Sequence, residues 1–342
     1  MELEIKMLWK NKTFLVLASH LIRMAGLIFL VSLGAFFLVS LSPLDPLQTN
    51  IGQTALGSMS QEQIEKLRIY WGTDLPPGKR FLSWAFDFFR GDMGFSLLYR
   101  QPVSHIIWIK LKNSVWMMGT AWLVSGILGF LMGVAAGAKK GSLLDRGISA
   151  WALITASTPA FWLALVLLII FSVWLKLLPI GLSVPIGVET SDITIKDRII
   201  HAILPTAVLS ITGISSVALH TRKKMAEVME SDYVWFARAR GDSTWKIVKR
   251  HGIRNILFPA ITLQFASVSE IFGGSVLVEQ VFSYPGLGQA AVAAGLGQDI
   301  PLLLGITVIS SAIVFAGNAA ADSLYELVDP RIRNERKKRK SR

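Results

Sequence analysis

Six long apolar stretches divide this chain and restrict it to a helical fold embedded in a membrane. They cover approximately residues 21–41, 114–138, 148–175, 203–219, 259–280 and 302–325. Each is close to the roughly 20 residues that an α-helix needs to cross the hydrocarbon core of a bilayer. With 52% hydrophobic and only 17% charged residues, the chain is too apolar for a soluble domain of 342 residues. We therefore predict an all-α polytopic membrane protein with about six transmembrane helices.

The distribution of basic residues predicts which side of the membrane each segment faces. If both termini are cytoplasmic, 24 of the 35 lysine and arginine residues lie inside, in agreement with the positive-inside rule. The predicted order is a cytoplasmic N-terminus at 1–20, a first transmembrane helix at 21–42, an extracytoplasmic segment at 43–112, a transmembrane core at 113–325 and a basic cytoplasmic tail at 326–342. This topology explains most of the net charge of +12, so no nucleic-acid partner is expected.

The extracytoplasmic segment 43–112 contains a predicted helix start. Ser60 precedes a helical pattern, and Gln63 stands at the third helical position. This is the arrangement of a capping box, in which the two side chains bond to each other's backbone N–H groups. We expect a short helical subdomain in this segment.

A polar segment at 220–258 separates the fourth and fifth apolar stretches and carries nine lysine and arginine residues. Its pattern is helical from Lys223 to about Ala239. Gly241 can take the left-handed conformation that ends a helix, and Ser243 is placed to cap the next helix. The sequence therefore predicts a pair of helices on the cytoplasmic side.

The sequence lacks the common motifs of catalytic, phosphate-binding and metal-binding sites. No phosphate-binding G-x-x-x-x-G-K-[ST] loop, H-E-x-x-H or G-x-S-x-G motif is found, and there is no cysteine. His105 and His201 are too isolated to suggest a metal site. We therefore expect no enzyme and no bound metal, and if this protein does work, another chain must supply the energy.

Two groups of residues inside the apolar stretches predict helix packing. Gly129, Gly133 and Gly137 recur at intervals of four, which puts them on one helix face where a neighbouring backbone can approach closely. Asn318 and Asp322 are also four residues apart and share a face, where hydrogen bonds to another helix are expected.

Several motifs resemble the permease subunits of ATP-binding cassette importers, in the branch that imports oligopeptides, dipeptides and nickel. That branch has A-R-A-K-G followed, ten residues on, by H-A-L-R-N and a proline, and this chain has A-R-A-R-G at 237–241, H-G-I-R-N at 251–255 and then Pro259. Further similar stretches are SMSQEQIEKLRIYWGTDLP at 58–76, RGDMGFSL at 90–97, ASTPAFWLALVLL at 156–168, VEQVFSYPGLGQA at 278–290 and LVDPRIR at 327–333. The resemblance covers nearly the whole chain.

The resemblance implies that the chain works in the cytoplasmic (inner) membrane of a bacterium or archaeon as part of a complex. The expected partners are a second homologous permease subunit, two cytoplasmic ATPase subunits and an extracytoplasmic solute-binding protein. ATP and Mg²⁺ would bind to the ATPase subunits and no cofactor to this chain. Peptides are the first expected substrate, and nickel or a metal chelate is the alternative within the branch. An ion-coupled secondary transporter is an alternative outside it, and a membrane enzyme would need convergent acid, base or nucleophilic groups.

In such importers the helix pair between the fourth and fifth spans contacts the ATPase. The resemblance assigns this contact to seven residues, which are Ala237, Arg238, Ala239, Gly241, His251, Arg254 and Asn255. Trp235 and Phe236 depart from the family pattern, which has a basic residue and a small or hydroxylated residue there. They either fit an unusual cleft on the partner or pack inside the helix pair.

Glu270 lies about halfway along the fifth apolar stretch, where a charged group costs roughly 2.5–3.5 kcal/mol on insertion scales. The family more often has an apolar or small residue near this position. One hypothesis is that Glu270 lines the translocation cavity and attracts a cationic part of the substrate, such as a peptide amino group. The other is that it is a protonated or hydrogen-bonded packing residue.

Overall fold

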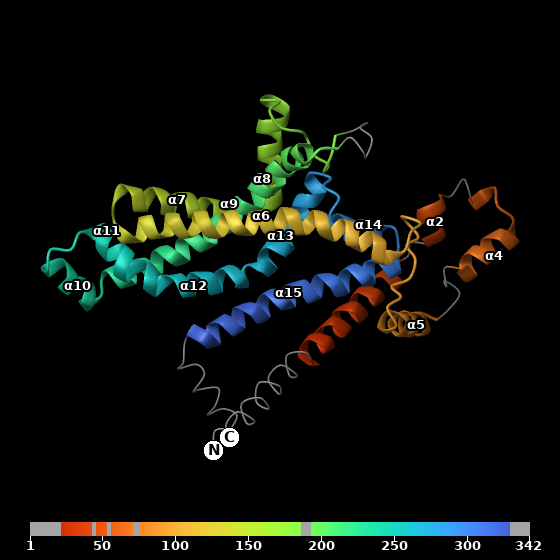
Figure 1. Cartoon of the computed structure of the whole chain (residues 1–342). Helices are drawn as coiled ribbons and strands as arrows, with labels where there is room; N and C mark the ends of the chain where they lie inside the picture. The colour runs from red at the N-terminus through yellow and green to blue at the C-terminus, as the bar shows by residue number, and fades with distance from the viewer. Residues whose placement is uncertain (1–21, 43–45, 53–55, 71–75, 186–192, 329–342) are drawn as a thin grey trace, which may run out of the picture. The chain divides into compact units, whose positions relative to one another are not determined.

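The computed structural model describes residues 22–42, 46–52, 56–70, 76–185 and 193–328 (Figure 1). In these ranges the regular elements are helices, apart from one isolated bridge between Phe95 and Pro102. Four helices are long and apolar enough to cross a membrane, namely Ile22–Ser40, α6 (Val103–Ala138), α9 (Ile195–Met229) and the Ile300–Leu324 part of α15 (Ile300–Val328). Two bent helix pairs bring the number of candidate spans to six. The prediction of an all-α polytopic membrane protein is confirmed.

The third predicted span, 148–175, is a bent helix pair. It consists of α7 (Leu143–Ala156) and α8 (Ala160–Leu168), which continues as the π-helix η1 (Ile169–Trp174), and the two parts meet at 101°. The break is at Pro159, which lacks a backbone N–H and disfavours helical geometry in the residue before it. The span therefore turns sharply in the middle of its apolar sequence.

The fifth predicted span, 259–280, is also divided, but more gently. Helix α12 (Ile253–Ala266) ends at Ser267, and α13 (Val268–Val281) continues at an angle of 42°. Pro259 lies inside α12, which remains helical on both sides of it. The bend therefore falls at Ser267 and not at the proline.

The fourth predicted span, 203–219, is the centre of the much longer helix α9. This helix begins after Thr194, whose side chain and that of Asp197 form a capping box. It runs for 35 residues and ends at Met229. The predicted helix from Lys223 to Ala239 is therefore wrong as a single element, because its first part belongs to α9 and the chain turns at residues 230–231 before α10 (Asp232–Ala239).

The described chain forms two compact units. The first contains the residues up to Lys112 together with Ala290–Phe315, and the second contains Asn113–Gln289 and the residues from Ala316 onward. The expected transmembrane core 113–325 is therefore divided, because 290–315 groups with the N-terminal part of the chain. The predicted N-terminal segment 1–20 and all but three residues of the predicted tail 326–342 lie outside the described residues.

The first unit includes the expected extracytoplasmic helices. These are α2 (Pro46–Ile51), α4 (Gln61–Tyr70) and α5 (Pro77–Phe89). The capping box predicted before α4 is present, since the Ser60 backbone N–H donates to Gln63 Oε1 at 2.9 Å and the Gln63 N–H donates to Ser60 Oγ at 3.2 Å. The last ten residues of the predicted segment 43–112 belong to α6, which begins at Val103.

An apolar cluster and a buried carboxylate hold the first unit together. Phe36 of the Ile22–Ser40 helix and Phe81 of α5 lie 5.4 Å apart between ring centres, in a cluster with Ile300 and Leu304 of α15. Next to them, the wholly buried Asp299 accepts hydrogen bonds from the Ser96 hydroxyl and from the backbone N–H groups of two leucines. Burial outweighs these hydrogen bonds and raises the pKa of Asp299 above its ordinary value. The carboxylate thereby joins the loop before α6 to the start of α15.

In the second unit the helices α6, α7, α9 and α12 lie alongside one another (Figure 1). Gly129, Gly133 and Gly137 of α6 all face α9. A Cβ atom on Gly129 would lie 2.7 Å from Cβ of Val217, and one on Gly133 would lie 2.5 Å from Cβ of Thr221. Real Cβ atoms do not approach other atoms so closely, so the two backbones can meet here only because these positions are glycine.

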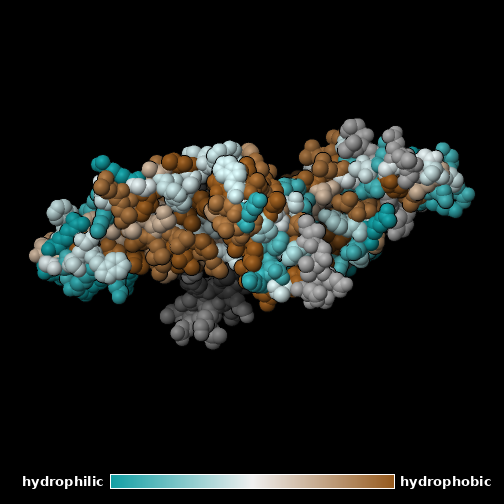
Figure 2. Space-filling model, turned by 90° about the horizontal axis from the view of Figure 1, so that it is seen from above, coloured by the Kyte–Doolittle hydropathy of each residue, from teal (hydrophilic) through white to brown (hydrophobic). Residues whose placement is uncertain are grey.

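Side-chain polarity varies along the second unit. On the face that Figure 2 shows, hydrophilic side chains gather at the end that carries α10 and α11 (Thr244–Ile247), and hydrophobic side chains cover the neighbouring helices. Large apolar residues are exposed on the long helices of this unit, including Leu123, Ile127 and Leu131 of α6. This is the surface expected of helices that face lipid chains, with a polar end outside the membrane.

Candidate functional site

The polar segment between α9 and α12 folds into a compact element, residues 230–255, that we call the knob. After α10 the chain turns at Gly241, whose φ of +86° is the left-handed conformation predicted from the sequence. The Ser243 side chain then accepts a hydrogen bond from the Lys246 N–H and caps α11, also as predicted. The π-helix η2 (Val248–Gly252) leads from α11 into α12.

The interior of the knob is small and apolar. Val234 and Ala237 of α10 pack against Ile247, in one cluster with Met225 and Met229 at the end of α9. All five side chains are buried. The knob is therefore built on the end of a membrane-spanning helix, and its inner face is fully used for packing.

The structure places the seven residues of the predicted ATPase contact in different environments. Arg238, Ala239, Gly241, Arg254 and Asn255 are exposed, whereas Ala237 is completely buried and His251 is half-buried. Ala237 faces the interior of the knob, where its small side chain lets α10 lie close to α9. Sequence periodicity could not show this, because α10 has only eight residues.

His251 belongs to a small polar group on the knob. Its ring lies 5.9 Å from the ring of Tyr233, and the Asn255 amide donates to both the His251 carbonyl at 2.8 Å and the Tyr233 hydroxyl at 3.2 Å. The His251 Nε2 atom is buried and has no hydrogen-bond partner among the described residues. The group fixes the start of α12 against α10.

Three aromatic side chains cover the outside of the knob. Trp235, Phe236 and Trp245 are 62%, 72% and 69% exposed, respectively. Of the two roles left open for Trp235 and Phe236, packing inside the knob is thus wrong for this chain. The Arg238 guanidinium lies 6.0 Å from the centre of the Trp235 ring, which adds a cation to this surface. Exposed aromatic and arginine side chains are the residue types that dominate binding energy at protein interfaces.

A polar cleft of about 720 Å³ lies in the second unit, between α7, α8, α9 and the bent pair α12–α13. The polar and charged side chains at its wall are Thr155, Thr158, Thr212, Ser216, His220, Lys223, Ser267 and Glu270. Glu270 is exposed to this cleft and forms no hydrogen bond or ion pair with another described residue. The structure thus places Glu270 where a solute could reach it, whereas a packing residue would be covered.

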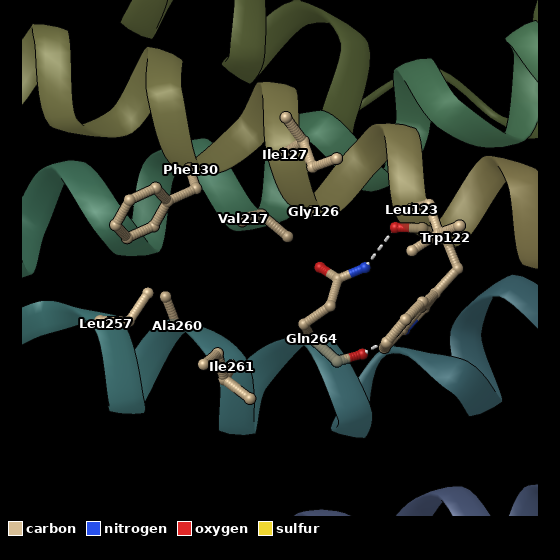
Figure 3. Close-up of a pocket in the computed structure, with 10 residues that line it drawn as sticks. All are labelled: Trp122, Leu123, Gly126, Ile127, Phe130, Val217, Leu257, Ala260, Ile261 and Gln264. Carbon is tan, nitrogen blue, oxygen red and sulfur yellow. Dashed lines mark hydrogen bonds between the residues drawn. The ribbon is translucent and has the colours of Figure 1, made fainter.

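A second, smaller cavity of about 260 Å³ lies between α6 and α12 (Figure 3). Trp122 and Gln264 close one end with two reciprocal hydrogen bonds, from the indole N–H to the Gln264 carbonyl at 2.7 Å and from the Gln264 amide to the Trp122 carbonyl at 2.6 Å. The remaining lining is apolar and includes Phe130 and Leu257. This cavity offers no charge to a polar solute and is explained by helix packing.

Asn318 and Asp322 do not form the hydrogen bonds that the sequence predicted. Both side chains are exposed, and neither is hydrogen-bonded to another residue in the part of the chain that the structure describes. Within the described residues, these two side chains therefore add no hydrogen bond to helix packing.

Sequence reasoning missed the partners of two buried carboxylates in the second unit. Asp145 at the start of α7 is buried and forms an ion pair with Arg222 of α9. Glu279 at the end of α13 is completely buried and accepts hydrogen bonds from the Ser114 hydroxyl at 2.7 Å and the Gln289 N–H at 2.9 Å. Both pairs join residues far apart in the sequence, and only the unusual position of a carboxylate at a helix end could have drawn attention to them.

The bent apolar helices, the knob and the polar cleft are together features of a membrane transport subunit. Comparison with known families gives the same result, because residues 127–334 match the model of the binding-protein-dependent transport system inner membrane component. The chain belongs to this family and is a multi-pass inner-membrane protein. It is thus a permease component, in a class of transport systems whose name states their dependence on a binding protein.

Individual relatives are similar along almost their entire length. The oligopeptide transport system permease protein AppB of Bacillus subtilis is 33% identical over 323 residues, which cover 92% of this chain and 99% of AppB. The di/tripeptide transport system permease protein DppB of Pseudomonas aeruginosa is 32% identical over 338 residues, which cover 93% of this chain and 99% of DppB. The family resemblance drawn from the sequence motifs is confirmed.

Proposed function

We propose that this chain is a pore-forming permease subunit of an ATP-driven importer and that it translocates peptides delivered by an extracytoplasmic solute-binding protein. The relatives named above support peptides as the substrate, since each is named for peptide transport. A second homologous permease would complete the pore, and two cytoplasmic ATPase subunits would bind ATP and Mg²⁺. Both termini of the chain are then cytoplasmic.

The observation that carries this proposal is the knob. It is attached to α9, has a closed apolar interior and presents exposed aromatic and basic side chains. A partner ATPase that moves the knob moves α9 with it, because Met225 and Met229 of α9 are part of the knob's interior. Coupling of ATP hydrolysis to alternating access through residues 220–258 needs a rigid connection of this kind. A secondary transporter would have no use for it.

Glu270 has a supporting role in this proposal. Its carboxylate is accessible from the polar cleft, so it can attract the amino group of a peptide during passage. A charge in a membrane span is tolerated where it lines a water-filled cavity.

Purification and transport test the proposal together. We expect the tagged chain, extracted from its native membrane in mild detergent, to carry a second permease and cassette ATPase subunits that mass spectrometry identifies. In proteoliposomes, the complex with its binding protein should import peptides when ATP is supplied, and a proton-gradient uncoupler should have no effect. A chain that purifies alone and loses peptide uptake with the uncoupler would contradict the proposal and favour a secondary transporter.

A further inference from the structure

The polar cleft carries charges of opposite sign on two different helices. Glu270 belongs to α13, and Lys223 belongs to α9, and both line the cleft. Lys223 is exposed and, like Glu270, has no ion pair or hydrogen bond with another described residue. The neighbouring Lys224 behaves differently, since its ammonium group pairs with Glu227 at 2.9 Å. The two charges in the cleft are therefore available to a solute.

Contacts between the helices fix the levels of the Glu270 and Lys223 backbones along the cleft. Leu209 lies 3.5 Å from the Cβ position of Gly274, and Met225 lies 2.6 Å from that of Gly252, so α9 runs antiparallel to the α12–α13 pair. Glu270 stands one turn before Gly274 and is consequently level with residues 212–213 of α9. Lys223 is about ten residues further along α9, which corresponds to roughly 15 Å at 1.5 Å per residue.

The wall between the two charges is hydroxyl-rich. Thr212 and Ser216 of α9 and Ser267 at the α12–α13 bend line this stretch, opposite Thr155 and Thr158 at the α7–α8 break. The hydroxyl hydrogens of Thr158, Thr212 and Ser267 already donate to backbone carbonyls of the same chain. Their oxygens can still accept hydrogen bonds from the backbone N–H groups of a peptide of any sequence. The half-buried ring of His220, one turn before Lys223 on α9, also lines this stretch.

We infer that this cleft holds an extended zwitterionic peptide of about four residues, with its amino group at Glu270 and its carboxylate at Lys223. An extended chain advances about 3.3–3.6 Å per residue, so four residues bridge a separation of roughly 15 Å. A dipeptide spans only about 7 Å, less than half of this backbone separation. The inference rests on the proposed function, and it adds the length and terminal charges of the preferred substrate to it.

Import of one tetrapeptide in three forms tests the inference in the intact importer. The peptide is supplied with free termini, N-acetylated or C-amidated, and the rates are compared between wild type, Glu270→Gln and Lys223→Gln. We expect Glu270→Gln to reduce the preference for the free over the acetylated peptide about threefold to fivefold, the size typical of one exposed ion pair. Lys223→Gln should reduce the preference for the free over the amidated peptide by a similar factor.

Three controls separate this effect from others. Lys224→Gln removes the adjacent charge outside the cleft and should leave both preferences unchanged. The binding protein is the same in all variants, so its own selectivity cancels when each preference is divided by the wild-type value. If a neutral variant imports nothing, Glu270→Asp and Lys223→Arg decide the question, since they keep the charges and should keep the wild-type preferences.

Chain length provides the second readout. The loss of import in the double variant Glu270→Gln, Lys223→Gln should be greatest for peptides of about four residues and smaller for dipeptides. Peptide import with unchanged preferences in all variants, or charge-keeping variants that lose the preferences, would overturn the inference and leave the proposed function intact. A wild-type complex that imports no peptide at all would instead refute the proposed function.

Discussion

The two ends of the second unit use their polar residues in opposite ways. At the knob, charged and aromatic side chains lie on the surface and the interior is apolar. At the other end, residues 279–289, which we call the Glu279 turn, enclose a carboxylate completely and bury Phe282 and Tyr284 around it. A surface with unused binding groups is suited to a partner, and a turn with all its groups engaged is suited to holding its own shape.

The largest change in stability is expected from loss of the carboxylate in the Glu279 turn. Glu279→Ala leaves the Ser114 hydroxyl and the Gln289 N–H buried without their acceptor. Hydrogen bonds to charged groups contribute about 1.5–3 kcal/mol each, so we expect a loss of about 3 kcal/mol or more. Thermal unfolding of the detergent-purified complex measures it.

The matched control for this substitution is Glu270→Ala, in the same helix. Glu270 is exposed and has no partner within the described residues, so its removal should change the unfolding temperature little. Equal destabilisation by the two substitutions would show that the carboxylate in the Glu279 turn is not the stabilising group.

Two glycines, Gly286 in the Glu279 turn and Gly241 in the knob, allow the two regions to be compared directly. The Cβ atom of Gly286→Ala would collide with the Glu279 carboxylate, and overpacking of this kind costs about 1–3 kcal/mol. At the knob, Gly241→Ala meets no atom but must keep a positive φ, at a cost of about 1 kcal/mol. Thermal unfolding should therefore rank Gly286→Ala as the more damaging. The reverse order would mean that backbone strain outweighs crowding in this chain.

Substitution of the aromatic surface should separate stability from partner binding. Trp235→Ser with Phe236→Ser is expected to change the stability of the chain by no more than about 0.5 kcal/mol, because both side chains are exposed. The affinity for the ATPase subunit should fall about thirtyfold, which is the effect of removing an aromatic hot spot of about 2 kcal/mol. Co-purification of the ATPase subunit measures this loss. Leu123→Ser in α6, also exposed but distant from the knob, provides the comparison. Unchanged ATPase affinity would remove the aromatic surface from the coupling contact.

The smallest expected effect is on how the stability of the knob depends on pH. The Lys246 ammonium group, 2.6 Å away, lowers the pKa of Asp242 below its ordinary value of 3.8. A lowered pKa in the folded state gives stability that is present above pH 3.8 and is lost as the pH falls through the folded-state value. Asp242→Asn should remove this pH-dependent contribution to stability. Acid unfolding monitored by circular dichroism between pH 5 and about 2 measures the difference. An unchanged acid profile would show that the ion pair makes no contribution in solution.

Local features of the fold could be predicted from the sequence because they depend on neighbouring residues. The caps at Ser60 and Ser243 and the left-handed turn at Gly241 are examples. The bend at Pro159 could have been predicted by the same reasoning, since proline is a strong signal against a straight helix. The apolar run around it, however, is long enough to suggest one span.

Features that depend on distant residues could not be predicted. Glu279 and Ser114 are 165 positions apart, so nothing near Glu279 indicates its partner. The burial of Ala237 depends on the end of α9, and the exposure of Asn318 depends on which helices surround α15. The position of Glu270 in the cleft follows from the antiparallel arrangement of α9 and α13. The motifs identified the family, and tertiary contacts decided the role of each polar group.

Helix α9 continues through Pro205 without a break, and its length has a mechanical consequence. With 35 residues, the helix is about 52 Å long, and Met225 and Met229 in its last two turns pack into the interior of the knob. A stiff rod held at one end amplifies rotation into displacement. A tilt of about 10° at the knob would swing the opposite end of the helix by roughly 9 Å, which is comparable to the width of a peptide chain with its side chains. In the proposed importer, small movements of a partner at the knob would thus be sufficient, in geometric terms, to open or close a passage at the opposite end of α9.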